Sequence, residues 1–199
     1  MNYWPMSNLS DVAGGADLFG RSSYSFTYDR FCSPNSSINF NKGYLQVPEG
    51  VYFRNDFTFT AWIYLKSYQS FSFFDFGNGQ SSDNIVLGIN QRNIFGKIFN
   101  RSSSLVIKTT SKINLNKWYF ISFVLSGTTG FIYVNGNQVA NGTLNVPNNI
   151  TRTTNYIGKS NLNAIYDELK IYQVALSPDD IMNEYQINAN NGKLNFYFI

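Results

Sequence analysis

The sequence predicts an all-β fold, a two-sheet antiparallel jelly-roll sandwich with one short C-terminal helix. Short apolar segments recur along the 199 residues, and Gly, Asn, Ser or Pro bounds each of them. Regularly spaced segments of this kind, with no helical pattern between them, are typical of antiparallel sheets packed face to face. Aromatic residues make up 18% of the chain and charged residues only 14%, which suits pleated, half-buried strands. The length fits one large sandwich domain.

The clearest strand is the segment Phe57–Leu65, in which apolar and polar residues alternate at the start. The alternation places Phe57, Phe59 and Ala61 on one face, and Ile63 continues it. Further strands are expected at residues 71–76, 85–90, 94–99, 104–109, 117–126, 130–135, 138–140, 154–158 and 163–174.

Two tryptophans are expected in the core. Trp62 lies in the alternating strand, and Trp118 opens the segment Trp118–Leu125, which is apolar on both faces. A strand that is apolar on both faces is expected at the centre of its sheet. Packing is the default role of large aromatic side chains in such segments.

Local signals mark one turn and one helix. Asn135 and Gly136 both tolerate the positive φ that a type I′ hairpin turn requires. Ser177 can cap the first free amides of a helix, and Pro178 suits the first helical position. The two aspartates that follow oppose the positive end of the helix dipole. We expect this helix to close one edge of the sandwich.

The C-terminal end is predicted to lie outside the main domain. The expected domain comprises residues 1–185, and residues 186–199 form a C-terminal extension or a final strand. Residues 186–192 are Asn-rich and turn-like, whereas Lys193–Ile199 fits either a last strand or the beginning of a following segment. The N-terminus has neither a basic start nor an apolar run, so it is not a signal peptide. If the protein works outside the cell, this sequence is therefore an excised domain or a fragment.

Composition excludes several classes of function. The net charge of +3 comes from scattered basic residues, and no basic run could follow a phosphate backbone, so nucleic acid is not an expected partner. No apolar stretch reaches the roughly 20 residues of a membrane span. Without histidine, Ser-His-Asp triads and the usual zinc sites are ruled out. The single Cys32 is expected to be a small, partly buried thiol.

Four segments, taken in order and spacing, carry a family resemblance. They are Tyr3–Met6 with Asp11–Gly15, Asn35–Gly43 leading to Asp56–Ile63, Lys117–Ile121 running into Phe131–Gly136, and Ala164–Tyr172 followed by Ala175–Ile181. Together they resemble the laminin-G-like, concanavalin-A-like jelly rolls, a group that includes the pentraxins, from residue 3 to about residue 185. The resemblance implies two curved antiparallel sheets of six or seven strands. It also implies a module of an extracellular or cell-surface protein that binds glycans or proteins beside neighbouring domains.

The resemblance also implies a calcium ion as a cofactor. Many relatives hold calcium between an early Asp-x-x-Gly loop and the aspartate of the last long strand. The matching residues here are Asp11, with Asp17 nearby, and Asp167. Calcium takes six to eight oxygen ligands from carboxylates and carbonyls. In the alternative interpretation, Asp11 caps a turn and Asp167 accepts backbone amides.

Glycan binding requires aromatic rings flanked by polar side chains. Tyr68, Asn161, Asn163 and Tyr166 are expected in loops or at strand ends, where they could form such a patch. A groove or loop rim that exposes aromatics beside carboxamides would favour binding, whereas a flat polar surface would favour a spacer.

Catalysis is not expected. The three glutamates lie far apart in sequence, and the Glu-x-Asp-x-x-Glu triplet of hydrolytic relatives is missing. Asp167 and Glu168 are expected on opposite faces of a strand. We therefore expect a non-catalytic module that binds carbohydrate or protein with the help of calcium. A structural spacer without a ligand is the alternative, and a glycoside hydrolase is a distant third.

Overall fold

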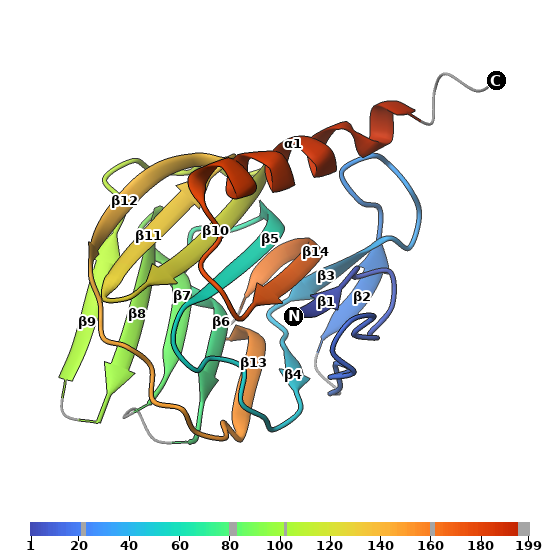
Figure 1. The fold of residues 1–199 in the computed structure, drawn as a ribbon. Coiled ribbons are helices and arrows are strands. Elements are labelled where there is room, and N and C mark those ends of the chain that lie inside the picture. Colours follow the sequence, from blue (N-terminus) through green and yellow to red (C-terminus); the bar gives the residue numbers. More distant parts are fainter. Residues whose placement is uncertain (21–22, 80–82, 102, 160–161, 195–199) are drawn as a thin grey trace.

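The chain folds into two stacked antiparallel sheets with one helix across one of them (Figure 1). The computed structural model describes residues 1–20, 23–79, 83–101, 103–159 and 162–194. The eight-stranded sheet has the order β12 (Asn137–Thr143), β11 (Thr129–Val134), β10 (Trp118–Ser126), β5 (Phe57–Leu65), β14 (Asn163–Tyr172), β3 (Ser37–Asn41) and β2 (Tyr24–Thr27), with β1 (Asn2–Trp4) also paired to β14. The six-stranded sheet has the order β4 (Leu45–Val47), β13 (Thr154–Lys159), β6 (Phe71–Gly77), β7 (Ile85–Asn90), β8 (Asn93–Asn100) and β9 (Ser103–Lys108). The predicted all-β sandwich is confirmed.

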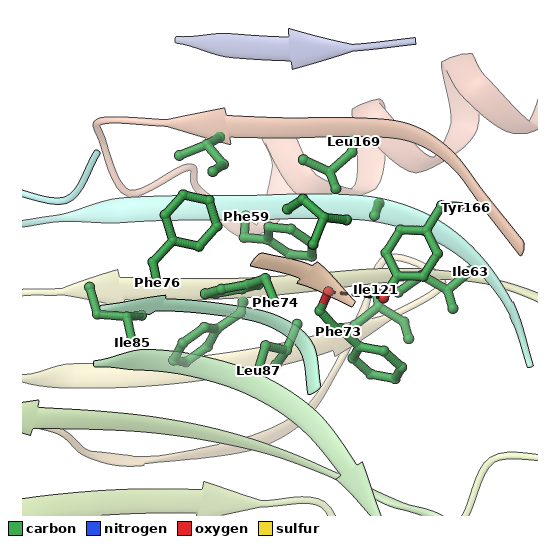
Figure 2. Close-up of a cluster of buried hydrophobic side chains, with 14 of the residues drawn as sticks. Phe59, Ile63, Phe73, Phe74, Phe76, Ile85, Leu87, Ile121, Tyr166 and Leu169 are labelled. Carbon is green, nitrogen blue, oxygen red and sulfur yellow. Dashed lines mark hydrogen bonds between the residues drawn. The ribbon is translucent and has the colours of Figure 1, made fainter. Parts of the chain in front are cut away.

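The main core fills the space between the sheets and is rich in phenylalanine (Figure 2). The alternation predicted for β5 is confirmed, because Phe57, Phe59 and Ile63 are fully buried in this core. The rings of Phe59 and Phe74, one from each sheet, lie 4.5 Å apart between centroids. Aromatic pairs of this kind add about 0.5–1.5 kcal/mol beyond the burial of apolar area.

A second apolar layer lies on the outer face of the eight-stranded sheet, the face turned away from the other sheet. Its buried members are Trp62, Phe120, Val124, Tyr133 and Ile181. Ile181 belongs to α1 (Pro178–Leu194), so the helix covers this face rather than only closing an edge. Trp62 is buried as predicted, but in this second layer. The prediction for Trp118 is wrong, because this residue packs at the margin of the second layer and is only partly buried.

The helix begins as predicted but ends later. Ser177 accepts a hydrogen bond from the backbone amide of Asp180 at 3.1 Å, and the Asp180 carboxylate accepts one from the Ser177 amide at the same distance. The turn predicted for residues 186–192 is wrong, because α1 continues to Leu194. Ala189 packs against the second apolar layer, and this tertiary contact outweighs the poor helix propensity of the asparagines. The final residues 195–199 lie outside the described part of the chain, so a strand there stays a prediction.

Left-handed backbone explains two local features. Asn135 and Gly136 have φ of 51° and 79°, which confirms the type I′ character of the β11–β12 turn. Cys32 has φ of 64° in the turn that joins β2 to β3, and its side chain is exposed. The expected partial burial of this thiol is therefore wrong, because the turn directs Cys32 away from both sheets.

Candidate functional site

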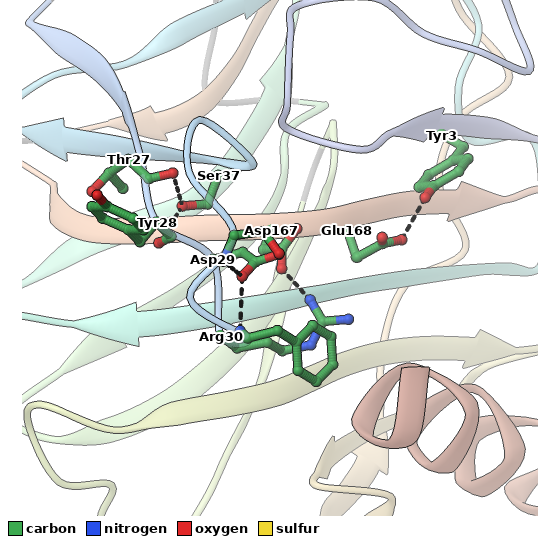
Figure 3. Close-up of polar contacts among 10 residues, drawn as sticks. Tyr3, Thr27, Tyr28, Asp29, Arg30, Ser37, Asp167 and Glu168 are labelled. Atoms are coloured by element: carbon green, nitrogen blue, oxygen red, sulfur yellow. Dashed lines mark hydrogen bonds and ion pairs between the residues drawn. The ribbon is translucent and has the colours of Figure 1, made fainter. Parts of the chain in front are cut away.

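A β-bulge in β14 places two acidic side chains on the same face. Asp167 pairs with Trp62 of β5, but the next pair joins Lys170 to Thr60, so two residues of β14 stand opposite one of β5. Glu168 adopts φ of 52° at this bulge, and Leu169 returns to the core. The prediction that Asp167 and Glu168 lie on opposite faces is wrong, because the extra residue shifts the alternation (Figure 3).

Both acidic side chains have protein partners. Asp167 forms an ion pair with Arg30, whose guanidinium also stacks on the Trp62 ring at 4.8 Å from its centroid. Burial raises the pKa of Asp167 to about 7, although Arg30 opposes this change. Glu168 accepts a hydrogen bond of 2.5 Å from the Tyr3 hydroxyl. These contacts hold β1 and the turn between β2 and β3 against β14, which is a structural role.

The Asp11 carboxylate is surrounded by nitrogen donors. Its oxygens accept five hydrogen bonds, from the amide of Tyr3 at 2.8 Å, the amides of Ala13, Gly14 and Ala16 at 3.1, 2.9 and 3.0 Å, and the side chain of Asn2 at 2.6 Å. Burial works against the charged form, but these donors outweigh it and lower the pKa of Asp11 to about 2. Asp11 thus caps the turn that it opens, as the alternative interpretation expects.

The carboxylates as placed do not fit a calcium ion. Calcium needs oxygen lone pairs, but those of Asp11 are engaged by N–H groups, and Asp167 is paired with Arg30. The third predicted ligand, Asp17, accepts the Asp11 amide at 2.9 Å. Nowhere in the described part of the chain do three or more Asp, Glu, Cys or His side chains form a group that could hold a metal. Calcium binding stays a prediction from the resemblance.

The residues predicted to bind glycan do not form one surface patch. The predicted position of Tyr166 is wrong, because this side chain is fully buried and its hydroxyl donates to the Phe73 carbonyl at 3.1 Å. The Tyr68 hydroxyl accepts the Leu115 amide at 3.0 Å, so it fixes a loop. Asn163 is partly buried where β14 begins, and Asn161 lies outside the described residues.

A groove of about 350 Å³ lies on the outer face of the eight-stranded sheet, beside the start of α1. The eight-stranded sheet contributes lining residues from β10, β11 and β12, and the chain segment that leads into α1 contributes the rest. Its lining comprises Val124, Ser126, Thr129, Phe131, Tyr133, Gln138, Ala175, Leu176, Ser177 and Pro178. No local pattern in the sequence predicts this groove, because its side chains are brought together only by strand register and by the return of the chain before the helix.

The register explains which side chains share the groove. Gln138 stands directly opposite Tyr133, and on the other side of β11 Val124 stands opposite Phe131 and Ser126 opposite Thr129. Phe131 is only partly buried, and its ring centroid lies 6.4 Å from that of Tyr133. Gln138 is exposed. The groove therefore combines aromatic rings with a carboxamide and hydroxyl groups, as expected of a binding surface.

A second hollow, of about 550 Å³, lies at the loop end of the sandwich. The loop Ala13–Ala16 and the segment Pro48–Tyr52 form most of its lining, with Gln173 beside them. Its aromatic residue, Tyr52, is buried and donates to the Pro48 carbonyl at 2.9 Å. Because the lining of this hollow includes no exposed aromatic ring, the groove beside α1 is the stronger candidate.

Solved structures share the fold at low sequence identity. The botulinum neurotoxin serotype G binding domain aligns with a TM-score of 0.72 and 14% identity over 90% of this chain and 48% of its own. The binding domain of botulinum neurotoxin DC, in complex with SialylT, aligns with a TM-score of 0.71 and 15% identity, over 89% of this chain and 48% of its own. A third match is domain 4 of AbnA, an extracellular arabinanase from Geobacillus stearothermophilus, in complex with arabinotriose. It aligns with a TM-score of 0.74 and 17% identity, over 92% of this chain and 96% of its own.

The chain thus spans about half the length of the two neurotoxin binding domains and nearly the whole of the arabinanase domain. No curated protein sequence matches it significantly. A family model does match, over residues 39–182, which is more than half of the chain. These residues include the six-stranded sheet, the eight-stranded sheet except β1, β2 and the start of β3, and the start of α1. The chain belongs to the concanavalin A-like lectin/glucanases superfamily, through its Laminin_G_3 family.

Proposed function

We propose that this protein is a non-catalytic recognition module that binds carbohydrate in the groove beside α1. The observation that carries the proposal is that the partly exposed ring of Phe131 and the exposed carboxamide of Gln138 line the same groove. The apolar face of a sugar ring packs on an aromatic ring, while its hydroxyls need donors and acceptors at the edge. The groove volume lies within the range of small-ligand sites.

Several observations support binding rather than catalysis. Asp167 and Glu168 are held by Arg30 and Tyr3 instead of facing each other across an open groove. The matched neurotoxin structures are binding domains, and the matched arabinanase domain is in complex with arabinotriose. We further propose that the protein acts outside the cell or at its surface, joined to other domains. The described chain has no helix with the length and apolar character of a membrane span.

A glycan-array screen followed by titration calorimetry tests this function. We expect the wild-type protein to bind at least one oligosaccharide class, and both Phe131→Leu and Gln138→Ala to weaken that binding about tenfold or more, or by about 1.4 kcal/mol. Leucine keeps apolar volume at position 131 but removes the ring face. Gln138 is exposed, so its loss should leave the fold intact. Circular dichroism and thermal unfolding check that both variants are folded.

Tyr44→Ala provides a matched aromatic control. Tyr44 is 40% exposed and packs edge-to-face on Tyr156. Tyr156 belongs to the six-stranded sheet, whereas the groove lies on the eight-stranded sheet. We expect its removal to leave glycan affinity unchanged. Loss of binding in Tyr44→Ala but not in the groove variants would place the site on the opposite sheet. Absence of binding to every glycan would favour the spacer.

A further inference from the structure

The groove beside α1 contains no ionisable carboxylate, ammonium or guanidinium group among its lining residues. The apolar lining residues are Val124, Phe131, Ala175, Leu176 and Pro178. The polar groups of the lining are hydroxyls and one carboxamide, from Ser126, Thr129, Tyr133, Gln138 and Ser177. Such groups can pair with sugar hydroxyls, but none of them can neutralise an anionic substituent.

The start of α1 beside the groove carries two carboxylates, which together exceed the partial positive charge of the helix N-terminus. Asp179 and Asp180 follow the lining residue Pro178 directly, and both are exposed. The hydroxyl and amide of Ser177 donate to Asp180 and lower its pKa, so this carboxylate is charged at neutral pH. An anionic sugar in the groove would therefore meet two like charges and would lose water without gaining a cationic partner.

We infer that the groove selects uncharged saccharides and discriminates against acidic ones such as uronates and sialylated glycans. The inference rests on the proposed function and adds the class of ligand. Discrimination has two sources, the lack of a cation in the lining and the carboxylates at the start of α1. The first source acts at any ionic strength, whereas the second is screened by salt because the aspartates are exposed.

Trigalacturonic acid and its methyl ester form a matched pair of probes, because esterification removes the charge of each carboxylate and adds only one methyl group there. Calorimetry with this pair, and with neutral trisaccharides of arabinose, xylose and galactose, measures the preference. We expect one or more neutral probes to bind, and the free acid to bind at least about tenfold more weakly than the ester. We also expect Asp179→Asn to leave the affinity for neutral probes unchanged. At low salt, the same change should reduce the difference in affinity between the free acid and the ester.

The outcomes separate this inference from the proposed function. If the acid binds as tightly as its ester, and Gln138→Ala weakens both, the groove is a glycan site but the inferred selectivity is wrong. If a sialylated or uronic probe binds while every neutral probe fails, the inference is also wrong. If no saccharide binds, or if Phe131→Leu and Gln138→Ala leave the affinity unchanged, both the proposed function and the inferred selectivity are wrong.

Discussion

Asp11 is the residue whose local role the structure defines most sharply. One carboxylate collects five N–H donors from its own loop and from β1 (Asn2–Trp4), so it joins the chain start to the sheet. An asparagine has only one acceptor oxygen and would turn its own amide toward those donors. Asp11 therefore stabilises the fold, because its charged carboxylate accepts hydrogen bonds from N–H groups that would otherwise lack an acceptor.

We expect Asp11→Asn to lower the free energy of unfolding at pH 7 by about 2–3 kcal/mol. The pKa falls from 3.8 to about 2 on folding, which corresponds to about 2 kcal/mol. Because the folded pKa is the lower one, this stabilisation is present above pH 4 and is lost as the pH falls toward 2. Urea unfolding from pH 7 to pH 2 measures it. A difference between wild type and variant that stays constant with pH would contradict this account.

At the scale of elements, α1 covers a face that is only partly apolar. Thr60 of β5 and Ser122 of β10 stand directly opposite each other on this outer face. Both are fully buried, and neither side-chain oxygen has a hydrogen-bond partner among the residues that the structure describes. A buried hydroxyl without a partner costs about 1–3 kcal/mol. The interface between helix and sheet is therefore less stable than its aromatic residues alone would suggest.

We expect Thr60→Val to raise the free energy of unfolding by about 1 kcal/mol, because valine keeps the shape and removes the unpaired hydroxyl. Thr58→Val on the same strand is the matched control. The Thr58 hydroxyl donates to the Val174 carbonyl and accepts the Leu176 amide, both at 2.9 Å, so its loss should destabilise by about 1–3 kcal/mol. Chemical denaturation compares the two. Equal destabilisation by both changes would mean that Thr60 also has a partner.

The same scale shows which local predictions succeed. The alternation of Phe57–Leu65, the Asn135-Gly136 turn and the Ser177 cap are confirmed, because each depends on neighbouring residues. The bulge at Glu168 was not predictable, since nothing in the local pattern distinguishes it from regular strand. Short strands such as β4 (Leu45–Val47) were missed, because three residues are too few to show a period.

At the scale of the whole molecule, two sheets and a helix leave the rims and outer faces for contact with ligands. Of the predicted ligand residues, Tyr166 lies inside the core, and the groove is built instead from β10, β11, β12 and the segment before α1. The metal predicted from the resemblance belongs to this scale too, because its ligands would come from segments more than 150 residues apart.

Thermal unfolding in excess calcium and in chelator tests that metal. Because Asp11, Asp17 and Asp167 already have nitrogen partners, we expect the melting temperature to be the same in both conditions. Calcium that binds only the folded state, at a concentration of about 100 times Kd, would raise the free energy of unfolding by about 2.7 kcal/mol. A rise of several degrees in calcium would therefore restore the site predicted from the resemblance.

The sequence by itself determined the all-β class, most of the strands, the hairpin turn and the start of the helix. These features follow from side-chain period, turn residues and caps, which act over a few neighbouring positions. Only the tertiary structure decided that Arg30 pairs with Asp167, that α1 covers the outer face, and that Phe131 and Gln138 share a groove. Such contacts join residues distant in sequence, and their geometry depends on strand register and on a bulge that no local pattern encodes.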